Sequence, residues 1–233
     1  MSTFVLIPGA GGEAWYWHLV SGELETRGHH AIAVDLPAGD DSAGWLEYAD
    51  AVVRATGDRT GVVLVAQSLA GFSAPLVCEQ MPVERVVLLN AMIPTPGETG
   101  GDWWSNTGQE AAQREYLSSI GVDPDTAGDP AVVYFHDVPP EVVAEAFDRG
   151  EPAQSMTPMT QVWPLAAWPD VPTLVLTGSQ DRLFPASFQR RIAKERLGID
   201  AQEVDGGHLL ALSRPRELAE RLDGIAIEDG PPI

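Results

Sequence analysis

The sequence VVLVAQSLAG, residues 62–71, constrains the fold more than any other stretch of this chain. Four consecutive apolar residues lead to Ser68, and alanine stands two residues before it and two residues after it. Apolar residues at helical spacing then continue to about residue 80. This pattern predicts a buried strand over residues 61–66, a tight turn that carries one hydroxyl, and a helix over residues 69–80. One large class of enzymes exposes a nucleophilic serine on such a turn.

The rest of the chain alternates between short apolar runs and helical patterns. The runs predict strands over residues 4–7, 30–36, 85–89, 173–177 and 200–204, and the helical patterns lie over residues 13–27, 45–55, 184–197 and 215–223. Near-continuous apolar strands that alternate with helices indicate an α/β fold, with a mostly parallel sheet of about six strands covered by helices on both faces.

The alternation stops between residues 93 and 168, where no apolar run matches those strands. Helices are predicted there over residues 107–120 and 139–149, and a Pro/Gly-rich stretch over residues 94–101 marks the start of the segment. We therefore expect an α/β core formed by residues 1–92 and 169–233, with a helical cap inserted over residues 93–168. The end of the chain, residues 228–233, is expected to fray.

Charge and cysteine content narrow the choice of partners and compartment. The chain has 233 residues and a formal net charge of −20. Nucleic acid is therefore an unsuitable partner, and an anionic membrane surface is disfavoured. The charge is typical of an acidic soluble surface, although steering of a cationic substrate stays open. A single cysteine, Cys78, excludes an internal disulfide. The first residues contain neither a basic region nor an apolar segment as long as that of a signal peptide. We therefore expect a cytoplasmic protein. A homodimer stays open.

A serine hydroxyl becomes a good nucleophile only when a base accepts its proton and a third group orients that base. Functional groups gather at the carboxyl ends of strands in such sheets. Asp181 follows the strand at residues 173–177, and His208 follows the strand at residues 200–204. We predict Ser68 as the nucleophile, His208 as the base and Asp181 as the orienting acid. Asp205 and Asp170 are rival acids, and Asp205 could also help to orient the histidine.

The order serine, acid, histidine is that of the α/β-hydrolases, and the chain resembles that superfamily over nearly its whole length. It is most similar to the small esterase and hydroxynitrile-lyase-like branch, through VLIPGA at residues 5–10, Trp15, AQSLAG at residues 66–71 and GH at residues 207–208. The family usually has glycine where Ala66 and Ala70 stand. The resemblance implies an oxyanion hole formed by the backbone N–H groups of Ala10 and Leu69.

Substrate-binding residues are expected in the glycine-rich first loop, beside the serine and in the cap. Gly9 next to Ala10 leaves room for a ligand, and we also expect contacts from Gln67, Trp104 and Trp163. The cap is rich in aromatic residues, which suits a hydrophobic ligand. The stretch YFHDVPP at residues 134–140 is similar to the cap of bacterial relatives. No cluster has metal-ligand spacing, and no cofactor is implied.

These features together favour a serine hydrolase that cleaves a carboxylic ester of a small hydrophobic substrate through an acyl-enzyme. Transfer of the acyl group to an alcohol and a lyase reaction on the same triad are alternatives. Hydroxynitrile lyases have lysine and threonine where this chain has Leu209 and Gly9, which disfavours cyanohydrin cleavage. A small-ligand-binding homologue without turnover is a further alternative, because fold does not fix function.

Overall fold

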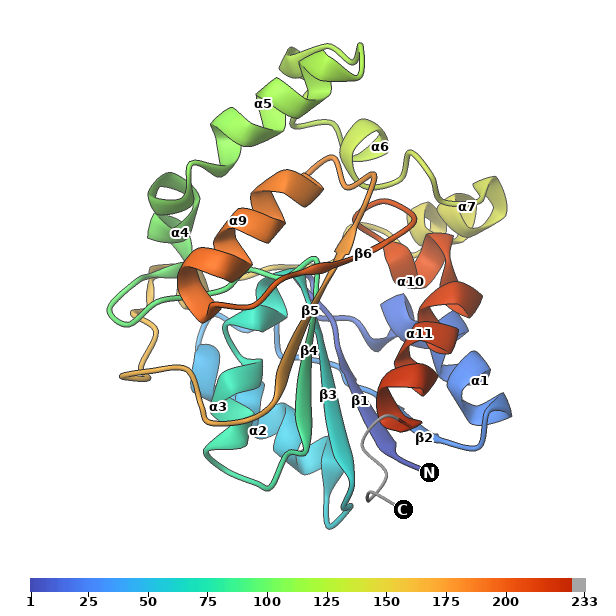
Figure 1. Cartoon of the computed structure of the whole chain (residues 1–233), viewed down its shortest axis with the longest axis vertical. Helices are drawn as coiled ribbons and strands as arrows, with labels where there is room; N and C mark the ends of the chain where they lie inside the picture. Colours follow the sequence, from blue (N-terminus) through green and yellow to red (C-terminus); the bar gives the residue numbers. More distant parts are fainter. Residues whose placement is uncertain (228–233) are drawn as a thin grey trace.

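A computed structural model describes residues 1–227 of the chain. Its centre is a sheet of six strands in the order β2-β1-β3-β4-β5-β6 (Figure 1), and every neighbouring pair is parallel. The strands are β1 (Thr3–Ile7), β2 (His30–Ala33), β3 (Val62–Gln67), β4 (Arg85–Leu89), β5 (Thr173–Gly178) and β6 (Gln202–Val204). The predicted sheet is confirmed. The expected fraying of residues 228–233 lies outside the described residues.

Alternate residues of the central strands face two separate hydrophobic cores. In β1, Val5 and Ile7 face one core, whereas Phe4 and Leu6 face the other, and all four are fully buried. A strand buried on both faces needs apolar side chains at every position, which explains the uninterrupted apolar run in the sequence. In Figure 1 the helices α2 (Trp45–Thr56) and α3 (Ala74–Cys78) cover one face, and α1 (His18–Thr26) and α11 (Pro215–Ile227) cover the other.

Several helices differ from their predicted ranges for identifiable reasons. The helix expected over residues 69–80 is divided into a 3-10 helix, η2 (Ser68–Gly71), and α3, which has Pro75 in its first turn. The helix expected over residues 13–27 is divided into η1 (Ala14–Trp17) and α1. Strand β2 ends at Ala33, and the Asp35 carboxylate instead accepts a hydrogen bond from the Ala14 N–H at 2.7 Å.

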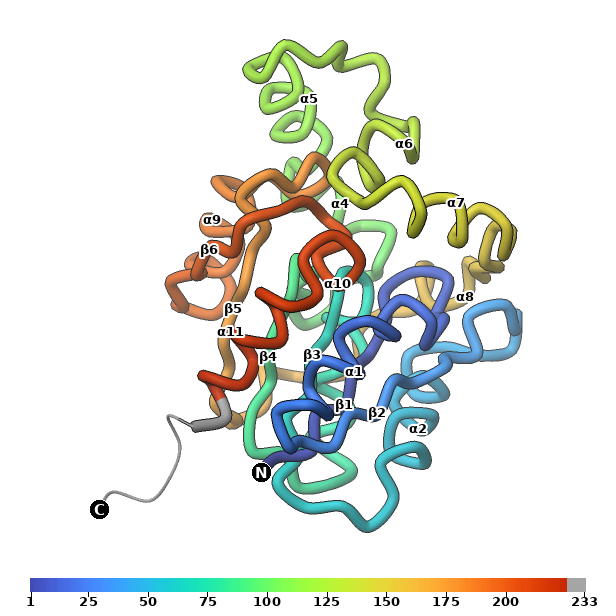
Figure 2. Tube along the Cα trace, turned by 90° about the vertical axis from the view of Figure 1, so that its right-hand side faces the viewer, coloured from blue at the N-terminus to red at the C-terminus, as the bar shows by residue number. Residues whose placement is uncertain are grey.

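The segment of residues 93–168, which we call the cap segment, joins β4 to β5 through short helices. These are α4 (Gly100–Thr107), α5 (Gln109–Ser119), η3 (Pro124–Thr126), α6 (Pro130–Val133), α7 (Pro140–Asp148) and α8 (Thr157–Thr160). Figures 1 and 2 show α5, α6 and α7 beyond the carboxyl ends of the strands. Helix α4 was not predicted, because glycine begins it. Thr99 caps that helix by accepting a hydrogen bond from the Asp102 N–H.

The strand order places two loops side by side. The chain leaves β1 toward β2 on one flank, whereas β3 pairs with β1 on the other flank. Parallel sheets open a crevice at such a reversal, at the carboxyl ends of the strands. The loop after β1 and the turn after β3 therefore meet there, together with the cap segment. In residues 1–227 no helix is long and apolar enough to cross a membrane.

Candidate active site

Ser68 lies on a sharp turn between β3 and η2, in the left-handed region with φ 52°. This conformation is costly for a residue with a side chain and persists where the surrounding structure enforces it. The enforcement comes from close backbone packing. A Cβ added at Gly9 would lie 2.8 Å from the Ser68 Cβ, and one added at Gly71 would lie 2.9 Å from the Met92 carbonyl carbon. Real Cβ contacts stay beyond 3.0 Å, so both positions require glycine.

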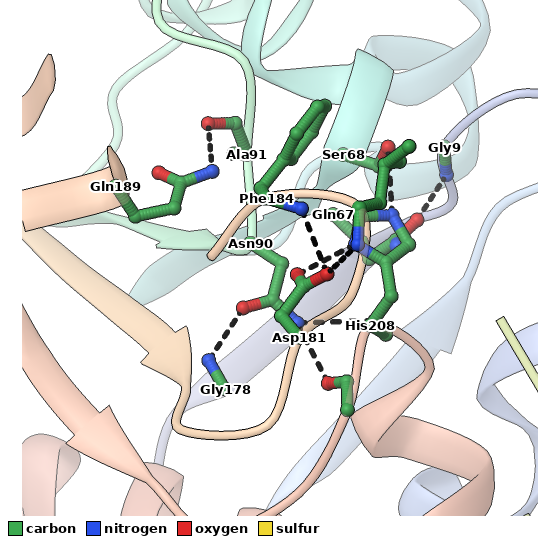
Figure 3. Close-up of polar contacts among 12 residues, drawn as sticks. Gly9, Gln67, Ser68, Asn90, Ala91, Gly178, Asp181, Phe184, Gln189 and His208 are labelled. Atoms are coloured by element: carbon green, nitrogen blue, oxygen red, sulfur yellow. Dashed lines mark hydrogen bonds and ion pairs between the residues drawn. The ribbon is translucent and has the colours of Figure 1, made fainter. Parts of the chain in front are cut away.

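The three predicted catalytic residues form one chain of hydrogen bonds (Figure 3). The Ser68 Oγ lies 3.1 Å from His208 Nε2, and His208 Nδ1 lies 2.8 Å from Asp181 Oδ2. Asp181 is fully buried and His208 is 2% exposed. An imidazole held in this way accepts a proton at Nε2 while its other nitrogen faces the carboxylate. The geometry suits proton transfer from the serine hydroxyl.

The acid is held by the backbone of its own loop. Asp181 Oδ1 accepts hydrogen bonds from the N–H groups of Leu183 at 2.8 Å and Phe184 at 2.9 Å. These two bonds fix the carboxylate and leave Oδ2 directed at His208. The rival acids lie elsewhere. Asp170 is exposed, and Asp205 accepts hydrogen bonds from Ser179 and Gln180.

Three N–H groups of the loop after β1 are already paired within the protein. The Gly9 N–H donates to Gln67 Oε1 at 3.0 Å, the Gly11 N–H to Gln154 Oε1 at 2.9 Å, and the Gly12 N–H to the Gly9 carbonyl at 3.1 Å. Within residues 1–227 the Ala10 N–H has no such partner, and neither does the Leu69 N–H. Two unpaired donors beside a serine can stabilise an oxyanion.

Gln67 and Gln154 both hold this loop through hydrogen bonds. Gln67, from the end of β3, is 4% exposed and fixes the Gly9 N–H. Gln154, from the cap segment, bonds the Gly11 N–H and donates to the Tyr48 hydroxyl at 3.1 Å. Gln67 was predicted as a substrate-binding residue, whereas Gln154 was not predicted. No local pattern marks Gln154, since Gly11 and Tyr48, the two partners through which it holds the loop, lie more than 100 positions away.

Aromatic rings surround His208. The ring centroids of Tyr134 and Phe184 lie 5.6 Å and 5.3 Å from that of His208. Burial raises the pKa of the Tyr134 hydroxyl, and the nearby Asp181 charge adds to the effect. Such rings exclude water from the imidazole and strengthen its polar contacts. The hydroxyl of Tyr134 stays neutral in this setting.

A small cavity borders the same loops. It is lined by Gly9, Ala10 and Gln67 near the nucleophile, by Leu209 after the histidine, and by apolar side chains that include Trp15, Tyr16, Phe135, Pro152 and Leu212. Its apolar walls suit a hydrophobic group.

The two predicted cap tryptophans occupy different environments. Trp104 is half-buried and packs on Phe184, with ring centroids 5.7 Å apart, so it lies one ring away from His208. Trp163 is 2% exposed, and its indole N–H donates to the Phe72 carbonyl at 3.0 Å. Trp163 therefore packs in the hydrophobic core, and neither tryptophan lines the cavity.

Comparisons with known proteins agree with this fold. The sequence profile described as "Alpha/beta hydrolase family" matches residues 4–221. The chain belongs to the α/β-hydrolase family. The prediction of this fold and of an α/β-hydrolase enzyme is confirmed. Among the described residues no group of three His, Cys, Asp or Glu side chains could hold a metal ion.

Named relatives match along almost their full length. "Probable esterase PIR7A" of Oryza sativa subsp. indica is 29% identical over 256 residues, which cover 96% of this chain and 96% of that protein. "Methylesterase 3" of Arabidopsis thaliana is 24% identical, with 95% of each chain covered. The crystal structure of polyneuridine aldehyde esterase superposes with a TM-score of 0.78 at 21% identity, covering 97% of this chain and 99% of that one.

Proposed function

We propose that this α/β-hydrolase cleaves carboxylic esters of small hydrophobic substrates, with Ser68 as its nucleophile. The observation that carries the proposal is the chain from Ser68 Oγ through His208 to Asp181, which lies beside the unpaired N–H groups of Ala10 and Leu69. The esterase names of its relatives support the same reaction class.

The geometry suggests the following order of events. His208 Nε2 accepts the Ser68 hydroxyl proton as Oγ attacks the ester carbonyl, and the Ala10 and Leu69 N–H groups stabilise the oxyanion. The protonated His208 then donates its proton to the departing alcohol, which leaves an acyl group on Ser68. Water, deprotonated by His208, attacks that acyl group and releases the carboxylic acid. The Asp181 carboxylate stabilises the imidazolium in both steps.

The residues after the histidine and before Ala10 favour hydrolysis over the lyase alternative. Leu209 lines the cavity with an apolar side chain, so it gives no positive charge to hold a cyanide leaving group. Gly9 has no side chain, and a Cβ there would collide with Ser68. Acyl transfer uses the same residues and differs only in whether water or an alcohol reaches the acyl-enzyme.

A p-nitrophenyl acetate assay, combined with labelling by a fluorophosphonate, tests the proposal. Ser68→Ala is expected to abolish labelling and to lower kcat by at least about 1000-fold. Ser73→Ala is the matched control, because Ser73 is also buried near the turn but donates only to the Ala70 carbonyl. Turnover that survives in Ser68→Ala, or a wild-type protein that neither turns over nor takes the label, would rule the proposal out.

The acyl specificity can be measured with the same assay. A series of p-nitrophenyl esters from acetate to octanoate is expected to show an optimum at short to medium chains, since the cavity beside Ala10 is small. Leu209→Trp, which narrows that cavity, is expected to move the optimum toward shorter chains. An unchanged chain-length profile in this variant would show that the acyl group binds elsewhere.

A further inference from the structure

Asn90, at the end of β4, has a conformation that asparagine tolerates better than most residues. It is fully buried and has φ 45°. Asparagine is enriched several-fold in this left-handed region, because its short polar side chain can compensate through local hydrogen bonds. The residue lies beside the triad without touching a reacting atom (Figure 3).

The Asn90 side chain joins the loop of the acid to the loop of the base. Its Nδ2 donates to the carbonyls of Gly207 and His208, each at 3.1 Å. Its Oδ1 accepts from the Gly178 N–H at 2.6 Å, three residues before Asp181. One amide thus uses both of its donor hydrogens and its acceptor on backbone groups next to catalytic residues.

The histidine loop is also held from the side of the cap segment. Asp137 Oδ2 accepts a hydrogen bond from the Gly207 N–H at 2.7 Å. The contact is close, because a Cβ at Gly207 would lie 2.6 Å from Asp137 Oδ1 and 2.8 Å from His136 Nε2. The carboxylate is almost fully buried, with a side-chain exposure of 7%. A buried carboxylate is costly unless it accepts strong hydrogen bonds, and this carboxylate accepts one from Gly207, the residue before His208.

We propose that Asn90 and Asp137 are positioning residues that clamp Gly207 from the core and from the cap segment, and so hold the His208 imidazole between Ser68 and Asp181. The inference rests on the proposed triad. The imidazole must satisfy two partners at 2.8 Å and 3.1 Å, and its position is set by the backbone at residues 207–208. A displacement of about 1 Å at such a site can lower the rate about 100-fold.

Two substitutions distinguish the effect of the Asn90 side-chain hydrogen bonds from the effect of its backbone conformation. Asn90→Asp keeps the shape and the acceptor for the Gly178 N–H, but it places a carboxylate oxygen against the carbonyls of Gly207 and His208. Asn90→Gly removes all three hydrogen bonds and relieves the positive φ. Both variants are expected to lower kcat about 100-fold, with KM changed less than about threefold. Val52→Ala, in the core on α2, is the control for lost stability alone.

The spectroscopic readout does not depend on turnover. A proton hydrogen-bonded between His208 Nδ1 and Asp181 gives a low-field NMR resonance, which His208→Ala identifies by its loss. We expect this resonance to broaden or shift in both Asn90 variants and to stay unchanged in Val52→Ala. For the cap side, Asp137→Asn keeps an oxygen that can accept from the Gly207 N–H, so it should retain more kcat than Asp137→Ala by about tenfold.

The outcomes are separable from those of the proposed function. Wild-type protein without Ser68-dependent labelling would refute the hydrolase proposal, while the NMR resonance would still report on the clamp. Wild-type kcat and an unchanged resonance in Asn90→Gly would refute the clamp, and Asn90→Gly decides the question if Asn90→Asp does not fold. Equal kcat in Asp137→Ala and wild type would remove Asp137 from the proposal.

Discussion

Gly71→Ala tests whether close backbone packing is what holds Ser68 in place. The added methyl would lie 2.9 Å from the carbonyl carbon of Met92 and closer still to its oxygen. Because carbon atoms rest about 3.5–4.0 Å apart, the two backbones must separate by roughly 1 Å. The Met92 N–H donates to the Ser68 carbonyl at 2.9 Å, so this separation acts directly on Ser68, the proposed nucleophile.

The expected cost appears in both stability and rate. Overpacking of a tight contact costs about 1–3 kcal/mol, which corresponds to a Tm lower by about 2–12 °C for a chain of this length. A shift of Ser68 by about 1 Å is expected to lower the rate of fluorophosphonate labelling about 100-fold. Thermal unfolding and labelling kinetics on the same preparation give the two numbers.

Ala70→Gly is the matched control, one residue away. Ala70 is also buried, and removing its methyl lowers stability by about 0.5–1 kcal/mol through backbone entropy without pushing on Met92. Its labelling rate is expected to stay close to wild type. If Gly71→Ala also labels at the wild-type rate and keeps its Tm, the turn is not held by this contact and the reasoning fails.

Three further predictions concern the surroundings of the site. The largely buried Arg196 guanidinium lies 2.9 Å from Glu98 Oε1. Glu98→Ala leaves this guanidinium without its carboxylate, so it should lower the free energy of urea unfolding by about 3 kcal/mol. A decrease below about 1 kcal/mol would contradict this prediction. Gln154→Ala should lower kcat while leaving Tm nearly unchanged, because the Gly11 N–H loses its partner in the loop of the proposed oxyanion hole. An unchanged kcat would show that the loop keeps its conformation without Gln154. Burial raises the pKa of the Cys78 thiol to about 12, whereas an unfolded thiol ionises near pH 8.5. The free energy of unfolding should therefore fall as the pH rises from about 8.5 toward 12, and it should fall less steeply in Cys78→Ala. Equal pH slopes of the free energy of urea unfolding in wild type and Cys78→Ala would refute this prediction.

The strands were predictable because they follow from local physics, and the three candidate residues because they lie directly after strands in the order of the α/β-hydrolases. A strand covered on two faces is apolar throughout, so β1, β3 and β4 are visible as runs. Parallel strands bring their carboxyl ends to one edge, so Asp181 and His208 could be expected near Ser68 from their positions after strands alone. The placement of the three residues agrees with that expectation.

The supporting residues were not predictable because their partners are distant in the sequence. Asn90 is hydrogen-bonded to Gly207, 117 positions away in the sequence, and Gln154 is hydrogen-bonded to Gly11, 143 positions away. A polar residue at a strand end or in a cap has no periodicity that reveals such a partner. The positive φ of Asn90 is likewise a product of tertiary packing, although asparagine directly after an apolar strand was a usable signal.

The alanines at residues 66 and 70 illustrate how a departure from a family pattern can be harmless. Glycine is expected there because strand and helix backbones nearly touch, yet both alanines are accommodated in the core that contains β3 and α3. Around Ser68, two positions that leave no room for a Cβ are Gly9, against the Ser68 Cβ, and Gly71, against the Met92 carbonyl. The requirement for glycine thus depends on which backbone atoms meet and not on a fixed spacing from the serine. A double variant, Ala66→Gly with Ala70→Gly, should therefore keep Ser68 reactive while lowering stability by about 1–2 kcal/mol, and a marked gain in labelling rate would show that the alanines do constrain the turn.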